Sequence, residues 1–258
     1  MTALKPRVMI TGAASGIGFG IAEFFAQQGY PILLTDLNEI ALNDAVILLK
    51  SQGFDIEGHL LNVADADSVE AIRQYQSRKP IGILINNAGM QFVSKLEDFP
   101  AEKWQQLIDV MLVGPAMLSR ALLPSMRAQG YGRIINIGSI HSLVASPYKS
   151  AYVSAKHGLL GFSKTLALET CDTDITVNTI CPAYVKTPLV EKQISDQAKN
   201  HGISEADVIN NIMLKPMPKK AFIGLDEIAN TAMFLSSTLA KNITGQAIAI
   251  DGGWTSST

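Results

Sequence analysis

The sequence contains little cysteine, and the cysteines it has do not form a recognisable pair. Cys171 and Cys181 are the only two among 258 residues, and neither lies in a CxxC or metal-ligand spacing. Their apolar neighbours predict two buried or half-buried thiols, which suits a reducing compartment. We therefore expect no disulfide framework and no metal site, and the cytoplasm is the expected location.

An excess of positive charge is also missing. Lysine and arginine number 21 against 23 acidic residues, a net charge of −2. No basic field is present to hold nucleic acid or an acidic membrane surface, so neither is an expected partner. The chain has no charged and apolar leader of the secretory type and no run of about 18 apolar residues, so we expect no transmembrane segment.

The residues that are abundant are hydrophobic, at 47% of the chain, which is long enough to bury a large core without disulfides. Short runs rich in Val, Ile and Leu alternate with stretches of helical periodicity. This alternation predicts an α/β fold: a Rossmann-type, doubly wound parallel sheet of about seven strands in a single domain, residues 1–258. The predicted strands are 7–11, 31–36, 56–63, 81–86, 133–139, 175–181 and 246–251, and the predicted helices are 17–28, 39–51, 68–78, 102–126, 150–170 and 226–236.

One stretch, residues 188–220, breaks the alternation. It is polar, helical in places, and ends in the proline-rich run KPMP at 215–218. A long insertion between the last strands of a compact domain is usually functional, so we predict a helical lid over a substrate site. A solvated surface excursion is the alternative.

The first predicted strand leads into a glycine-rich turn. Gly12, Gly16 and Gly18 are spaced G-x-x-x-G-x-G, with Ser15 and Ile17 between them. Gly12 allows a tight turn, and Gly16 lets the backbone approach a pyrophosphate at the helix N-terminus. Gly18 lets helix and strand pack closely. Glycines at a turn are common, but in the first βα unit they predict a dinucleotide-binding loop.

The second predicted strand ends in Asp36, 18 residues after Gly18. A carboxylate there can accept hydrogen bonds from both hydroxyls of an adenosine ribose and would repel a 2′-phosphate. No arginine or lysine occupies positions 13–15, 37 or 38. The cofactor predicted is therefore NAD rather than NADP. Asp36 could instead cap the next helix, but Asn38 can fill that role.

Two further turns complete the predicted cofactor site. Asn62 and Val63 close the third strand, where a short amide can reach an adenine edge. Asn87, Ala88 and Gly89 follow the fourth strand. Asn and Gly tolerate left-handed backbone, so this segment can turn sharply beside the cofactor.

A serine, a tyrosine and a lysine carry the predicted chemistry. Ser139 ends the fifth strand, Tyr152 follows 13 residues later, and Lys156 comes four residues after Tyr152, on the same helix face. An ammonium near a phenol, with a positive nicotinamide ring, can lower the tyrosine pKa toward that of a general base. Ser139 would hold the substrate oxygen. A Y-x-x-x-K pair alone arises by chance on many helices, so the interpretation depends on the whole set.

Together these motifs resemble the short-chain dehydrogenase/reductase family over essentially the whole chain. They are TGAASGIG at 11–18, NNAG at 86–89, Ser139, YVSAK at 152–156 and ICP at 180–182 with Thr187. The resemblance implies an oxidoreductase whose Pro182, Val185 and Thr187 join Tyr152 and Lys156 in binding the cofactor. It also implies a homotetramer with helices 102–126 and 150–170 at one interface.

A narrower resemblance, to the bacterial D-3-hydroxybutyrate dehydrogenases, runs through six segments. They are NNAGMQ at 86–91, LEDFP at 96–100, HSLVAS at 141–146, KSAY at 149–152, TPLVEKQI at 187–194 and DGGWT at 251–255. The resemblance implies a small hydroxy acid as substrate, with Gln91, His141, Lys149 and Gln193 around its carboxylate beside Ser139 and Tyr152. A carboxylate needs a cation and N–H donors of this kind. Each of the four taken alone could be an ordinary surface residue.

Two positions depart from the family pattern. Met111 stands where the family usually has an asparagine that joins a proton relay, and methionine offers no amide. We therefore expect the usual relay not to form. Ala183 replaces a glycine after Pro182. The alternatives left open are another enzyme of the family, such as a 3-oxoacyl reductase or a diol or sugar dehydrogenase, and a nucleotide-binding scaffold with little turnover.

Overall fold

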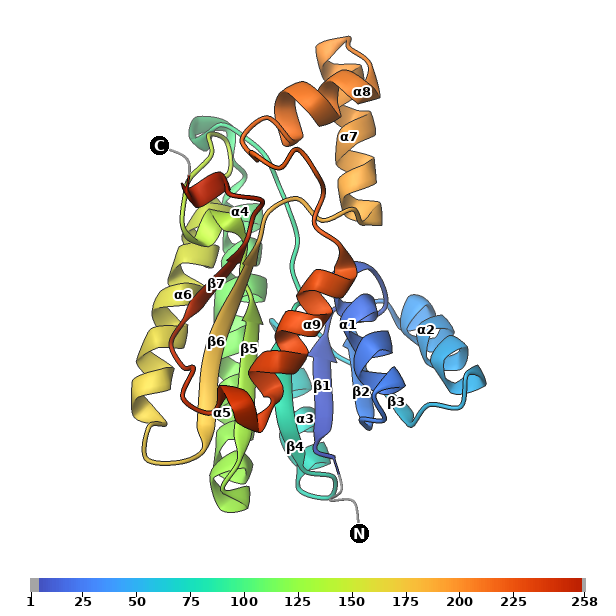
Figure 1. Ribbon diagram of the computed structural model, residues 1–258, viewed down its shortest axis with the longest axis vertical. Helices are drawn as coiled ribbons and strands as arrows, with labels where there is room; N and C mark the ends of the chain where they lie inside the picture. Colours follow the sequence, from blue (N-terminus) through green and yellow to red (C-terminus); the bar gives the residue numbers. More distant parts are fainter. Residues whose placement is uncertain (1–4, 257–258) are drawn as a thin grey trace.

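The computed structural model describes residues 5–256, apart from the side chains of residues 188, 189, 192, 196, 200 and 201. Its centre is a seven-stranded parallel sheet in the order β3-β2-β1-β4-β5-β6-β7 (Figure 1). The strands are β1 Arg7–Thr11, β2 Ile32–Asp36, β3 Ile56–Leu60, β4 Ile81–Asn86, β5 Gly132–Ile137, β6 Ile175–Pro182 and β7 Ala247–Ile250. The predicted doubly wound sheet is confirmed.

Helices cover both faces of the sheet (Figure 1). They are α1 Gly16–Gln27, α2 Glu39–Ser51, α3 Ala66–Gln76, α4 Ala101–Ile108, α5 Gly114–Gln129, α6 Ser150–Glu169, α7 Pro188–His201, α8 Glu205–Asp207 and α9 Leu225–Ser236. Short helical turns are η1 Leu96–Asp98, η3 Ile140–Ser142, η5 Thr238–Ala240 and η6 Trp254–Ser256, and the π-helical segments are η2 Asp109–Val113 and η4 Val208–Met213.

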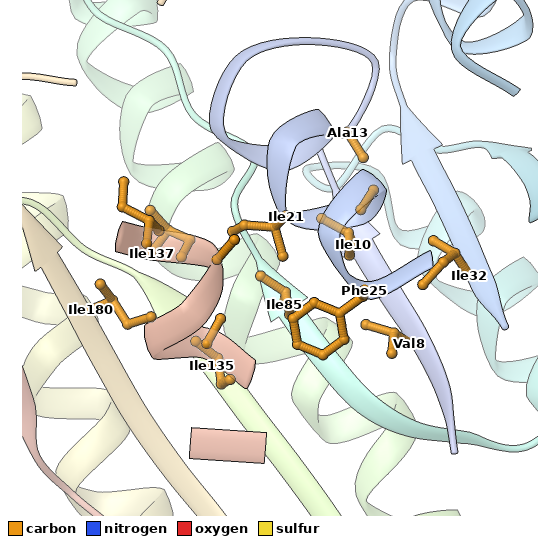
Figure 2. Packing of buried hydrophobic residues seen from close by; sticks show 14 of the residues in the cluster. Val8, Ile10, Ala13, Ile21, Phe25, Ile32, Ile85, Ile135, Ile137 and Ile180 are labelled. Atoms are coloured by element: carbon orange, nitrogen blue, oxygen red, sulfur yellow. The ribbon is translucent and has the colours of Figure 1, made fainter. Parts of the chain in front are cut away.

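The core has two halves, one on each face of the sheet. Helices α1, α2 and α9 pack on one face, where Val8 and Ile10 of β1 meet Phe25 of α1 (Figure 2). Helices α3, α5 and α6 pack on the other face, where Met9 of β1 belongs to the second cluster. Because successive side chains of a strand point to opposite faces, a strand covered on both sides is apolar throughout.

Two strands end at least two residues earlier than predicted. Strand β3 stops at Leu60 rather than at residue 63, because the side chain of Asn62 accepts a hydrogen bond from the Ala64 amide at 3.1 Å and turns the chain. Strand β5 stops at Ile137 rather than at Ser139. Ser139 instead caps the helical turn η3. Both residues therefore lie in turns at the carboxyl edge of the sheet.

The predicted helix 102–126 is a longer composite of α4, η2 and α5. As one helix, Ala101–Gln129 has 29 residues and a mean hydropathy of 1.5 in its most apolar window, enough by length and composition to cross a membrane. This differs from the expectation that no segment would qualify. Leu118, Leu122 and Met126 are fully buried in the cluster beneath the sheet, and core helices meet the same criteria.

The insertion 188–220 is helical, as predicted. It contains α7, α8 and η4, which stand beyond the carboxyl edge of the sheet (Figure 1). Ile194, Val208 and Met213 form a small core of their own. A bridge between Val185 and Ile223 joins the two ends of the insertion. Its function as a lid stays a prediction.

One prediction about the cysteines is wrong. Cys181 is buried on β6, but Cys171 is exposed, since it lies in the turn after the end of α6 at Glu169. The apolar residues near Cys171 in sequence do not surround it in space.

Candidate active site

The glycine turn and the NNAG turn meet where the strand order reverses. Strands β1 and β4 are neighbours, and their connections leave toward opposite sides, which opens a crevice at their carboxyl ends. The Asn87 side-chain amide donates to the carbonyls of Thr11 and Gly12, both at 2.9 Å. The Thr11 hydroxyl accepts the amides of Asn87 and Ala88, both at 3.0 Å. The two turns are thus joined into one rigid floor.

A cavity of about 960 Å³ opens above this floor. Every residue predicted for the cofactor or the substrate lines it, except Gly18. These are Gly12, Ser15, Gly16, Ile17, Asp36, Asn62, Val63, Asn87, Ala88, Gly89, Gln91, Ser139, His141, Lys149, Tyr152, Lys156, Pro182, Val185, Thr187 and Gln193. Residues spread over most of the chain therefore converge in one place.

Close backbone approach explains two of the glycines. Gly12 has φ +61°, and a Cβ there would lie 2.8 Å from the Ala88 Cα. A Cβ on Gly18 would lie 2.4 Å from the Gly12 carbonyl oxygen and 2.5 Å from the Asn87 side-chain nitrogen. Gly18 therefore lets helix α1 approach the glycine turn itself as well as the neighbouring NNAG turn.

The first turn of α1 fits a pyrophosphate. Ser15 is its N-cap and makes no capping hydrogen bond with its side chain, and the turn contains no acidic residue. Its free amides and the positive end of the helix dipole face the cavity through Ser15, Gly16 and Ile17. This arrangement suits the diphosphate of a dinucleotide.

Asp36 stands at the end of β2 beside this loop. One carboxylate oxygen accepts the Ala14 amide at 3.1 Å, and the other accepts the Asn38 amide at 3.0 Å. The side chain of Asn38 caps α2 by accepting the Ala41 amide, as predicted. Asp36 is thereby held in place, and each oxygen keeps lone pairs that can accept hydroxyl groups of a ribose.

Ser139, Tyr152 and Lys156 lie together on the other side of the cavity. The Ser139 hydroxyl accepts the His141 amide at 3.2 Å and interacts with the Tyr152 side chain, which lowers the pKa of that phenol. The Lys156 ammonium donates to the Ile137 carbonyl at 2.7 Å and lies 5.8 Å from the centre of the Tyr152 ring. Helix α6 supplies the tyrosine and lysine, while the turn after β5 supplies the serine.

The electrostatics of this group differ from the prediction. Burial raises the pKa of Tyr152, and the interaction with Ser139 acts in the opposite direction. Burial also lowers the pKa of Lys156 to about 8. Lys156 is not among the groups that shift the tyrosine pKa, because burial dominates for both side chains.

His141 and Lys149 form the polar end of the cavity. Burial and the nearby Lys149 lower the pKa of His141 to about 4, and burial lowers the pKa of Lys149. Ser146 lies 3.4 Å from the same imidazole nitrogen that faces Lys149. The imidazole is therefore neutral near pH 7 beside a cation, and the pair can present donors to an anion.

Two glutamines complete the predicted set of donors. The side-chain oxygen of Gln91 is buried and makes no hydrogen bond with the described part of the protein. Gln193 reaches the cavity from α7, the helix that Thr187 caps by accepting the Val190 amide at 3.4 Å. The insertion thus contributes directly to the cavity wall.

Sequence reasoning missed an aromatic wall around His141. The imidazole packs edge-to-face on Tyr152 at 6.1 Å and on Trp254 at 6.0 Å, and Trp254 stacks on Tyr184. The DGGWT segment at 251–255 carries part of the family resemblance, but no local signal in it predicts that its tryptophan packs against η3. The cavity wall formed by Glu102, Gln105, Gln106 and Asp109 was also missed; their spacing on one helix face was the available signal.

The two departures from the family pattern both lie in the wall. Met111 is fully buried in the middle of the π-helical segment η2, so the irregular turn forms without an asparagine. Ala183 lines the cavity, and its amide donates to the Ile250 carbonyl at 2.9 Å. Neither substitution therefore prevents the local backbone structure, the π-helical turn at Met111 or the hydrogen bond at Ala183, from forming.

Known proteins resemble this chain along almost its whole length. A family model described as enoyl-(acyl carrier protein) reductase matches residues 12–255. D-beta-hydroxybutyrate dehydrogenase of Rhizobium meliloti is 46% identical over 96% of this chain and 97% of its own. The enzyme of the same name from Cupriavidus necator is 41% identical over 95% and 96%.

A solved structure agrees with these relatives. L-sorbose reductase of Gluconobacter frateurii, in complex with NADPH and L-sorbose, superposes with a TM-score of 0.93 at 32% identity, covering 98% of each chain. The glycine turn, the crevice between β1 and β4 and the relatives point the same way. The chain belongs to the short-chain dehydrogenase/reductase family and is an oxidoreductase with a fold that binds a nicotinamide cofactor.

Proposed function

We propose that this protein is an NAD-dependent D-3-hydroxybutyrate dehydrogenase, which interconverts D-3-hydroxybutyrate and acetoacetate. The observation that carries the proposal is the convergence of Lys149, His141 and Gln91 in the cavity that also contains Ser139 and Tyr152. A ligand with a carboxylate at one end and a hydroxyl two carbons away suits such an arrangement. The similarity to two D-beta-hydroxybutyrate dehydrogenases supports it.

In this mechanism Tyr152 is the general base. As the substrate hydroxyl becomes a carbonyl, its proton passes to the Tyr152 phenolate, and its carbon loses a hydride. NAD, when bound, accepts that hydride. Ser139 holds the reacting oxygen: the His141 amide occupies one lone pair of its hydroxyl, which leaves one lone pair and one proton for Tyr152 and the substrate.

Lys156 supports the tyrosine electrostatically. With a pKa of about 8 it carries its charge at neutral pH, and its hydrogen bond to Ile137 anchors that charge beneath the cavity. A positive charge nearby stabilises the phenolate relative to the phenol. The positive ring of the cofactor, when bound, would add to this effect.

The substrate carboxylate is proposed to bind among Gln91, His141, Lys149 and Gln193. Lys149 supplies the positive charge, and the side-chain amides supply neutral donors. Since Gln193 is on α7, we propose that residues 188–220 act as a lid whose closure brings Gln193 onto the substrate and excludes water.

Asp36 is the basis for proposing NAD. Its carboxylate, held by the Ala14 and Asn38 amides, would repel the 2′-phosphate of NADP. The L-sorbose reductase that superposes on this chain was solved with NADPH, so members of the family differ in this choice. A reductase for another carbonyl substrate is the alternative. If that reductase used NADPH, the 2′-phosphate of the cofactor would have to bind beside the Asp36 carboxylate despite their repulsion.

Turnover with matched substrates tests the proposal. The purified protein is mixed with NAD and D-3-hydroxybutyrate, and reduced cofactor is followed by absorbance, with the L-enantiomer and NADP in parallel. We expect rapid reduction with the D-acid and NAD. A 3-oxoacyl thioester and L-sorbose, each with NADPH, are offered as competing substrates. Faster turnover of either one than of the D-acid would contradict the proposal, and NAD binding without turnover of any would favour a scaffold.

We also propose the homotetramer implied by the family resemblance. Val113 and Met117, at the η2–α5 junction, and Leu168 on α6 are exposed in the single chain, at 40%, 38% and 77%. Their burial in a helix–helix interface would remove this apolar surface from water. Light scattering of the purified protein should then give four times the mass of one chain.

A further inference from the structure

A second serine lies directly behind Ser139 and does not line the cavity. Ser142 is only 2% exposed, and its hydroxyl oxygen accepts the Ser139 amide at 3.2 Å. Its own amide donates to the Ser139 carbonyl at 2.8 Å. The first of these bonds is the return bond of a capping box, and together the two bonds close the turn η3.

The hydroxyl of Ser142 is also anchored from the neighbouring strand. It lies beside the thiol of Cys181, a fully buried residue on β6, and lowers the pKa of that thiol against the rise that burial causes. The space around it is tight: a Cβ on Gly138 would lie 2.8 Å from the Ser142 oxygen and 3.1 Å from the Cys181 sulfur. Ser142 is therefore held between the turn and the sheet, with no room to change rotamer freely.

This closure determines where the Ser139 hydroxyl points. The hydroxyl oxygen has two lone pairs and one proton, and the His141 amide takes one lone pair. The direction left for Tyr152 depends on where the turn places the His141 amide. That position depends in turn on the hydrogen bond between Ser142 and the Ser139 amide, because residues 139–142 form one closed ring of contacts.

We infer that Ser142 is a positioning residue: its hydroxyl, anchored on Cys181, closes the turn that aims Ser139 at Tyr152 and presents His141 to the substrate. The inference rests on the proposed roles of Ser139 and Tyr152, but not on which alcohol is oxidised. Ser142 itself touches neither the cofactor site nor the reacting atoms.

Replacement of Ser142 by alanine tests this inference in turnover. We expect Ser142→Ala to lower kcat about tenfold, equivalent to about 1.4 kcal/mol in the barrier. The acidic limb of the kcat/KM profile should move to higher pH, because the interaction with Ser139 is what opposes the burial-induced rise in the Tyr152 pKa. The affinity for NAD should not change.

A matched control comes from another short turn. Ser237 caps η5 by accepting the Leu239 amide at 3.2 Å, away from the cavity. Ser237→Ala removes a comparable cap and should leave kcat and the pH profile as in the wild type. Equal losses in the two variants would mean that Ser142 contributes only to general stability, which would overturn the inference.

A spectroscopic measurement separates this inference from the proposed substrate. The ionisation of Tyr152 in the NAD complex is obtained from tyrosinate absorbance, as the difference between each protein and its Tyr152→Phe version. We expect Ser142→Ala to raise that pKa and to speed hydrogen exchange of the Ser139 amide. If both stay unchanged, the inference is wrong, even if hydroxybutyrate is turned over. If both change while hydroxybutyrate is inert, the inference stands and the proposed substrate falls.

Cys181→Ala provides a second variant in case Ser142→Ala does not fold. It removes the thiol beside Ser142 and keeps the Ser142 hydroxyl. We therefore expect a smaller rise in the Tyr152 pKa and a smaller increase in hydrogen exchange of the Ser139 amide. Combined with Ser142→Ala it should add little, since the two side chains act as one unit. An unchanged Tyr152 titration in Cys181→Ala, with Ser142→Ala unfolded, would contradict the inference.

Discussion

The side-chain nitrogen of Lys149 lies 3.5 Å from the Nε2 of His141, at the polar end of the cavity. The two residues come from separate segments: His141 from the turn after β5, and Lys149 from the N-cap of α6. Each is buried enough for its pKa to fall, and each therefore resists carrying a charge. A carboxylate bound beside them would accept hydrogen bonds from both and favour the charged lysine.

Removal of the lysine should weaken binding of the acid more than the chemistry. We expect Lys149→Ala to raise KM for D-3-hydroxybutyrate by about 10- to 100-fold, the value of a hydrogen bond to a charged group, with kcat falling much less. Steady-state kinetics with an uncharged secondary alcohol should reveal no such increase. Lys241→Ala, at an exposed lysine outside the cavity, is the control. An equal loss with the uncharged alcohol would mean that Lys149 does not bind the carboxylate.

The phenol of Tyr152 should be indispensable for turnover but not for cofactor binding. We expect Tyr152→Phe to lower kcat by at least about a hundredfold, since general acid–base catalysis contributes at least that factor. NAD affinity, measured by calorimetry, should stay within a few fold. Tyr148→Phe removes an exposed phenol four residues away and should be nearly silent. Substantial activity in Tyr152→Phe would require another base.

The choice of cofactor should respond to charge at the end of β2. We expect Asp36→Asn with Leu37→Arg to reduce the ratio of kcat/KM for NAD to that for NADP by at least about tenfold, as repulsion of the 2′-phosphate gives way to attraction. Leu37 is a suitable site because it lines the cavity and is 67% exposed. Asp44→Asn on the exposed side of α2 controls for the lost charge. An unchanged ratio would place the discrimination elsewhere.

The buried imidazole of His141 should make the folded protein sensitive to acid. The unfolded chain binds a proton at this residue below about pH 6.5, whereas the folded protein binds it only near pH 4. Because the unfolded state then carries more protons, stability is fully present above pH 6.5 and is lost as the pH falls toward 4. Between pH 7 and pH 5 we expect His141 to lower the free energy of unfolding by about 2 kcal/mol, in addition to the effect of all other groups.

Urea unfolding of His141→Gln at the two pH values measures this contribution. The variant should lose about 2 kcal/mol less than the wild type over the same interval. His59→Gln, at a histidine of β3 that does not act on the His141 pKa, controls for the removal of an imidazole elsewhere. Parallel pH dependence in the wild type and His141→Gln would show that His141 titrates alike in both states.

The residues proposed to bind the cofactor could be located from the sequence because their signals are local. The spacing of Gly12, Gly16 and Gly18 and the acidic residue at the next strand end are properties of short segments, and the structure places them around one crevice. The end of β3 could not be predicted in the same way. Residues 61–63 read as strand, but the Asn62 side chain competes for the backbone and ends it.

The chemistry of Tyr152 illustrates a different limit. Its spacing to Lys156 is visible in the sequence, and both residues face the cavity as predicted. Their pKa values depend on how much water the folded protein removes from each, and burial dominates over their mutual attraction. The spacing of residue types in the sequence does not reveal how deeply each group is buried, so these pKa values could not be predicted from it.

The sequence by itself therefore determined the order of strands and helices, the glycine turn and the candidate catalytic side chains, because these follow from periodicity and local backbone geometry. Only the tertiary structure decided that Trp254 would pack on His141, that Ser142 would lie between Ser139 and Cys181, and that Cys171 would be exposed. Contacts between segments far apart in the chain depend on how the whole sheet and its helices pack, and that packing also fixes the dielectric surroundings of each buried group.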